Sequence, residues 1–96
     1  MHLEFSERVK TLLHTLSQDD REKVKAWFGY LRNWEEDVFV QSHSVALTVQ
    51  RQSMYLFRTT TDTRLFYTVD LESKTVFVID VASKDTILLF GNVSTR

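Results

Sequence analysis

The stretch RLFYTVDLESKTVFVIDV, residues 64–81, decides the fold class of this chain. Two runs rich in β-branched and aromatic residues flank a polar turn, which is the pattern of two antiparallel strands joined by a short connection. If Asp70 lies opposite Thr75 across that turn, the alternation of side chains assigns each residue to one of two sheet faces. The stretch therefore predicts the centre of an antiparallel sheet.

The same composition extends toward the N-terminus of this stretch. A polar, Thr-rich turn over residues 59–63 places Arg58 opposite Arg64 and makes the preceding run another strand. The expected strands are 38–41, 45–50, 54–58, 64–70 and 75–81, with a short strand at 2–5 and a short apolar segment at 87–90.

The region before residue 38 has helical periodicity instead. Ser6 and Ser17 are typical N-cap residues, and acidic residues follow Ser17 where a helix dipole favours them. Apolar residues then recur at helical spacing, and the second helix is expected to end near residues 35–37. The expected stripes are Phe5, Val9, Leu12, Leu13 and Leu16 in the first helix and Val24, Trp27, Phe28, Leu31 and Trp34 in the second.

Helices followed by strands predict an α+β fold, with an N-terminal helical hairpin packed on a twisted, mainly antiparallel sheet. The length suits a single domain over residues 1–96, and no linker or repeat divides it.

The two sheet faces carry more apolar surface than two helices can cover. A partner protein, self-association or the 87–90 segment is expected to cover the rest. One face is expected to hold Leu56, Arg58, Arg64, Phe66, Phe77, Ile79 and Val81, and the other Tyr55, Phe57, Leu65, Tyr67, Val69, Val76, Val78 and Asp80.

Composition excludes several kinds of site. The chain has no Cys, which rules out disulfides and thiolate metal sites and favours a cytoplasmic protein. The three His residues have no spacing that indicates a metal site, and no motif predicts a cofactor. No apolar run approaches the ~18 residues of a membrane span. A net charge of −1 disfavours tight, nonspecific nucleic-acid binding, so an RNA site would need a local basic cluster.

Several strings resemble the RelE/ParE superfamily of toxins from type II toxin–antitoxin systems. LEFSERVK (residues 3–10) resembles the family's opening strand and first helix, and MYLFR (54–58) resembles its middle strand. RLFYTVD (64–70) is similar to the family's central strand, and TVFVIDV (75–81) to the strand that follows. The resemblance implies the α+β fold already expected and an antitoxin partner that covers the exposed apolar and basic sheet surface.

For the ribonuclease branch, the resemblance also implies cleavage of mRNA on the ribosome. Arg64 matches the Arg that begins the central strand, and Lys84 falls where a further basic catalytic residue is usual. Arg58 is expected to help position the RNA. Independently of the family, guanidiniums at 58 and 64 would suit a phosphate, because each is planar and permanently charged. The alternative is that Asp62 or Asp80 neutralises Arg64.

The expected RNA contacts beyond this pair are Arg51 and Tyr55, whose ring could stack on a base. Tyr67 could stack on a base in the same way, but strand tyrosines are more often core residues with hydrogen-bonded hydroxyls, which is the interpretation we favour for both. For Lys84 we likewise favour an ordinary surface loop beside Asp85, and His43 is a candidate substitute acid or base.

Departures from the family pattern leave two other functions open. Phe90 stands where the family often has a catalytic Tyr, and Tyr55 and Phe57 stand where some members carry lysines. A ParE-like, non-enzymatic inhibitor of DNA gyrase fits this loss of proton-transfer groups. A non-toxic protein-binding module of the same fold fits it as well.

Overall fold

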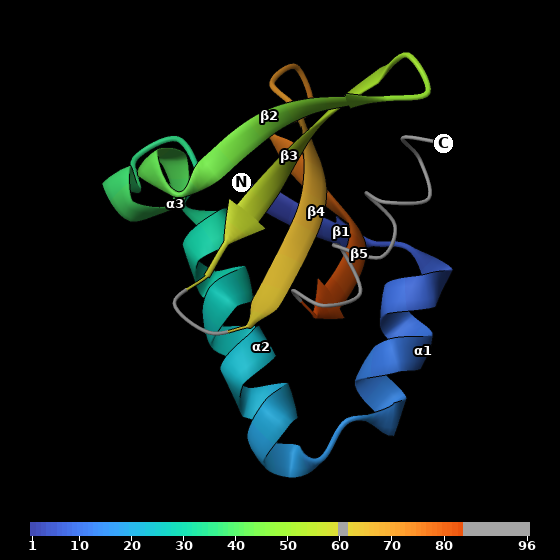
Figure 1. Cartoon of the computed structure of the whole chain (residues 1–96). Helices are drawn as coiled ribbons and strands as arrows, with labels where there is room; N and C mark the ends of the chain where they lie inside the picture. Colours follow the sequence, from blue (N-terminus) through green and yellow to red (C-terminus); the bar gives the residue numbers. More distant parts are fainter. Residues whose placement is uncertain (60–61, 84–96) are drawn as a thin grey trace.

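The computed structural model describes residues 1–59 and 62–83, which form one mixed sheet with helices against it (Figure 1). The strand order is β1-β5-β4-β3-β2. In chain order the elements are β1 (His2–Phe5), α1 (Glu7–Thr15), α2 (Gln18–Arg32), α3 (Val38–Ser42), β2 (Ser44–Val49), β3 (Gln52–Arg58), β4 (Thr63–Asp70) and β5 (Thr75–Ser83). The α+β prediction is confirmed.

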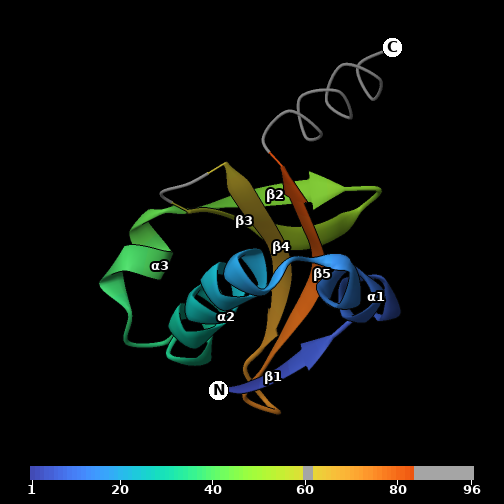
Figure 2. The ribbon, with the colours of Figure 1, turned by 90° about the horizontal axis from the view of Figure 1, so that it is seen from below.

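Both expected N-caps start their helices. Ser6 Oγ accepts the Val9 amide at 3.1 Å, and Ser17 Oγ accepts the Asp20 amide at 3.2 Å. The second helix ends at Arg32, before the acidic run at 35–37, because Asn33 already turns its amide back to the last carbonyls of the helix. α1 and α2 lie on the same face of the sheet (Figure 2).

The core fills the space between these helices and the sheet. We call the covered side the helix face and the opposite side the open face. The buried apolar residues of the core come from both layers, and they are Val9, Val24, Phe28, Leu31, Val40, Phe57, Leu65, Tyr67, Val76 and Val78. Trp27, expected in the helical stripe, packs partly buried against this cluster.

The strand expected at 38–41 is wrong, because these residues form α3. Asp37 caps this helix, and its carboxylate accepts the Val40 amide at 3.0 Å. Val40 is fully buried, and the Phe39 ring packs edge-on against Phe57. Val and Phe favour strands in isolation, but tertiary packing of one short helical turn outweighs that preference here.

Both expected strand pairings across turns are confirmed. Arg58 lies opposite Arg64, and Asp70 lies opposite Thr75. β1 adds a parallel strand beside β5, which makes the sheet mixed rather than wholly antiparallel.

A β-bulge corrects the expected faces of β5. Phe66 pairs with Asp80 and Tyr67 with Val78, so Ile79 is an extra residue in the ladder. Beyond it every side chain changes face: Val81 pairs with Leu65 on the helix face, and Asp80 lies with Phe66 on the open face. The assignments of Val81 and Asp80 from strict alternation are therefore wrong.

Candidate functional site

The open face carries two arginines at the end of β3 and the start of β4. Arg58 and Arg64 are directly opposed strand partners, and both point away from Phe57 and Leu65, their buried neighbours in sequence. Directly opposed residues have Cβ atoms about 5 Å apart, where like charges repel. An anion between the two guanidiniums would relieve this repulsion and accept several hydrogen bonds.

The two arginines differ in how firmly the protein holds them. Arg64 is half-buried, and its Nη1 donates to the Thr63 carbonyl at 3.0 Å. Arg58 is exposed and forms no ion pair with a carboxylate in the described ranges 1–59 and 62–83. Arg64 is thus positioned, while Arg58 is able to move toward a ligand.

The nearby carboxylate of Asp80 has a different partner. Arg8 Nε lies 3.4 Å from Asp80 Oδ1, and the same oxygen accepts the Val81 amide at 2.9 Å. This pair links α1 to β5. The interpretation in which Asp80 serves to neutralise Arg64 is weakened, because Asp80 already has a cation beside it.

An apolar surface adjoins the arginines on the open face. Val45 lies opposite Leu56, which lies opposite Phe66, so these three side chains form a row across β2, β3 and β4. Val45 and Phe77 each keep 36% of their surface exposed. The expected excess of apolar sheet surface is present on this side, away from α1 and α2.

The other expected RNA contacts lie elsewhere. Tyr55 is on the helix face, where its ring stacks on Tyr67 at 5.3 Å between centroids. Arg51 is exposed in the turn between β2 and β3, about 20 Å along the strand from Arg58 at ~3.3 Å per residue. Lys84 and the 87–90 segment fall outside the described residues. The structure brings together Arg58 and Arg64 and separates them from Tyr55 and Arg51.

Tyr67 is a core tyrosine with a bonded hydroxyl, as the alternative interpretation expected. Trp34 Nε1 donates to its oxygen at 3.0 Å, and Ser44 Oγ lies 2.7 Å away. Burial raises the pKa of Tyr67 above its usual value, against a smaller opposing effect of the two hydrogen bonds. A pocket of about 210 Å³ lies beside it, lined by Trp34, Gln41, Ser44, Tyr55 and Tyr67.

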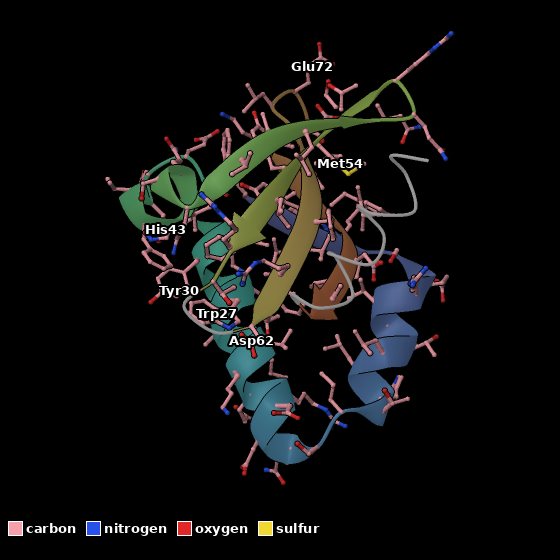
Figure 3. All side chains as sticks on the ribbon, in the orientation of Figure 1. Trp27, Tyr30, His43, Met54, Asp62 and Glu72 are labelled. Atoms are coloured by element: carbon pink, nitrogen blue, oxygen red, sulfur yellow. The ribbon has the colours of Figure 1, made fainter. Side chains whose placement is uncertain are left out.

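His43 lies at the same end of the sheet as the arginines. Its carbonyl accepts the Arg58 amide at 2.8 Å, and its ring packs on Phe39 with centroids 4.1 Å apart. Its Nδ1 lies 2.9 Å from the Phe39 carbonyl oxygen and 3.0 Å from Ser42 Oγ. Figure 3 shows His43 close to Tyr30 and Trp27, beside the end of β3.

Sequence comparisons with models of known families and with curated proteins found no match. Comparison with solved structures did. A chain of the RelBE2 toxin–antitoxin complex of Mycobacterium tuberculosis matches with a TM-score of 0.68 and 23% identity, over 85% of this chain and 95% of that one. The RelE–RelB complex of Pyrococcus horikoshii gives a TM-score of 0.64 at 17% identity, over 85% and 92% of the two chains.

The chain has the RelE fold. An E. coli RelE mutant in complex with a peptide of the antitoxin RelBc matches with a TM-score of 0.62 and 24% identity, over 85% of this chain and 81% of that one. The RelE fold accounts for the element order and for the helices on one face of a mixed sheet. Within the described parts of the chain, no helix is both long and apolar enough to cross a bilayer.

Proposed function

We propose that this protein is the toxin of a type II toxin–antitoxin system and acts on mRNA at the ribosome. The observation that carries the proposal is the pair of opposed arginines on the open face of a RelE fold. Arg64 would bind the scissile phosphate and stabilise the charge that develops there. Arg58, exposed beside it, would hold the neighbouring RNA backbone.

Cleavage of RNA also needs side chains that transfer protons, and the open-face neighbours of the arginines along their own strands are apolar. Leu56 and Phe66, the open-face neighbours of the arginines along β3 and β4, cannot donate or accept a proton. His43, whose carbonyl accepts the Arg58 amide, is the candidate acid or base at this end of the sheet. In this proposal the arginines supply electrostatic stabilisation, and His43 is the first residue to test as a base.

The apolar row beside the arginines supports an antitoxin partner. The solved relatives are toxin–antitoxin complexes. We propose that an antitoxin segment covers Val45, Leu56, Phe66 and Phe77 and approaches the arginines at its end. Its binding would bury apolar surface and block the phosphate site at the same time.

A second candidate is a non-enzymatic toxin that inhibits DNA gyrase. The apolar residues around the arginine pair favour it, because a surface that binds a protein target needs no acid or base. The two candidates share the open face and differ in the target.

One induction experiment separates them. After induction in bacteria, translation and mRNA integrity are measured beside the supercoiling of a reporter plasmid. Site-specific mRNA cuts that depend on translation are the expected result. A relaxed plasmid with intact mRNA would contradict the mRNA target and support inhibition of gyrase. Normal growth with neither change would contradict both toxin functions.

A further inference from the structure

The strand β2 is an edge of the described sheet, and its own sequence carries none of the features that usually protect an edge. Its sequence, SVALTV, contains no charged residue and no Pro, and its register against β3 is unbroken. The opposite edge is the shorter β1, which carries Glu4. Long, uncharged edges readily pair with another strand, and charges, Pro, bulges or short length normally prevent this.

The β2–β3 hairpin determines which backbone groups of β2 point outward. Gln50 and Arg51 form its two-residue turn, with φ values of 50° and 68° that are typical of a type I′ turn. Val49 and Gln52 are the partners that close this hairpin, and in a hairpin with a two-residue turn the closing pair exchanges hydrogen bonds. Because bonded pairs alternate, Val45 and Leu47 direct their amides and carbonyls to β3.

The bond from the Arg58 amide to the His43 carbonyl, 2.8 Å long, agrees with this alternation at the other end of the hairpin. Ser44, Ala46 and Thr48 therefore direct their amides and carbonyls away from β3. β3 is the strand that pairs with β2 in the described sheet, so these groups lack a strand partner.

We propose that two copies of the chain pair through β2, antiparallel, about a two-fold axis at Ala46. Ala46 would lie opposite Ala46 of the second copy, and Ser44 opposite Thr48. All these residues direct their backbone groups outward, so each pair exchanges two hydrogen bonds. In this register even-numbered residues of β2 pair with even-numbered residues, and odd-numbered with odd-numbered. The helix faces of the two copies therefore lie on the same side of one continuous sheet.

Side chains favour a second copy as the occupant. On the open face, Val45 of one copy would lie opposite Leu47 of the other, in the closely spaced pairs where side chains contact best. The small Ala46 at the axis lets the two strands approach without a clash on the helix face. Because β2 has no charge, two identical edges meet without repulsion.

The test is the association state of the full chain by sedimentation equilibrium, for wild type and three variants. Ala46→Lys and Ala46→Glu each bring two like charges to the axis. Ala26→Lys is the matched control, because Ala26 is an exposed alanine on α2. We expect a wild-type dimer, an unchanged control, and a dissociation constant raised about tenfold or more in each Ala46 variant.

Mixing Ala46→Lys with Ala46→Glu should restore the dimer, because opposite charges then face each other at the axis. Recovery on mixing also shows that both variants are folded. A wild type that stays monomeric overturns the proposal and leaves the β2 edge to a different chain. A dimer that survives in both Ala46 variants, or fails to return on mixing, overturns it as well.

Discussion

Arg64 is the residue in which family resemblance and geometry agree best. Its side chain is half-buried and held by the Thr63 carbonyl, so its charge is positioned before any ligand arrives. Arg64→Ala should lower the rate of mRNA cleavage by about 100-fold, as the loss of one preorganised donor does. Arg64→Lys should recover part of this, since lysine brings the charge without the two-donor fork.

The measurement is cleavage in a reconstituted translation reaction, with thermal unfolding recorded beside it. Arg32→Ala is the control, because Arg32 is an exposed arginine at the end of α2. Full activity in Arg64→Ala would remove Arg64 from the site.

Tyr67 offers a residue-scale prediction about stability. Tyr67→Phe leaves Trp34 Nε1 and Ser44 Oγ without their shared partner, which should lower the free energy of unfolding by about 1–3 kcal/mol. The control is Tyr55→Phe, which removes the hydroxyl of the ring that stacks on Tyr67. It should change the free energy of unfolding by about 0.5 kcal/mol or less. Urea melts compare the two, and equal midpoints would mean that the Tyr67 network contributes little.

The same hydroxyl predicts a pH dependence. Burial raises the pKa of Tyr67, so the folded protein keeps this proton at pH values where the unfolded chain loses it. Its contribution to stability is therefore complete below the unfolded pKa of about 10 and decreases as the pH rises above it. Urea melts from roughly pH 8 to roughly pH 11 should show a smaller loss of stability with rising pH in Tyr67→Phe than in wild type.

At the scale of elements, α3 depends on its cap. Asp37→Ala removes the carboxylate that accepts the Val40 amide, and it should cost about 1 kcal/mol of stability. Asp37→Asn should keep most of it, because an amide oxygen caps nearly as well. Val38→Ala is the control: Val38 follows the cap and is 79% exposed. If Asp37→Ala unfolds at the wild-type urea midpoint, α3 is held by packing of Val40 and Phe39 alone.

At the scale of the whole molecule, the chain should unfold as one unit. β1 pairs with β5, so the two ends of the described chain complete one sheet over one core. Trp fluorescence reports on Trp27, which lies in α2, and on Trp34, which follows the end of α2. Far-UV circular dichroism reports on all the helices and strands. Their urea transitions should coincide. Two separated transitions would contradict the single-domain prediction.

The sequence by itself determined the features that depend on neighbours along the chain. Ser6 and Ser17 begin helices because an N-cap needs one side-chain oxygen a turn away from its amide. The pairing of Arg58 with Arg64 follows from the short turn that joins their strands. Apart from residues 38–42, the order of helices and strands could therefore be predicted from the sequence.

Only the tertiary structure decided the features that depend on distant residues. Residues 38–42 became a helix because Val40 and Phe39 pack into the core, which local strand propensity does not register. Because of the bulge at Ile79, Val81 and Asp80 each lie on the face opposite to the expected one. The alternation of side chains in the sequence does not reveal such an extra residue. Alternation along the strands already placed Tyr55 and the arginines on opposite faces, but only the fold decided which face the helices cover. Tyr55 lies on the covered side, stacked on the buried Tyr67, and the arginines lie on the open side.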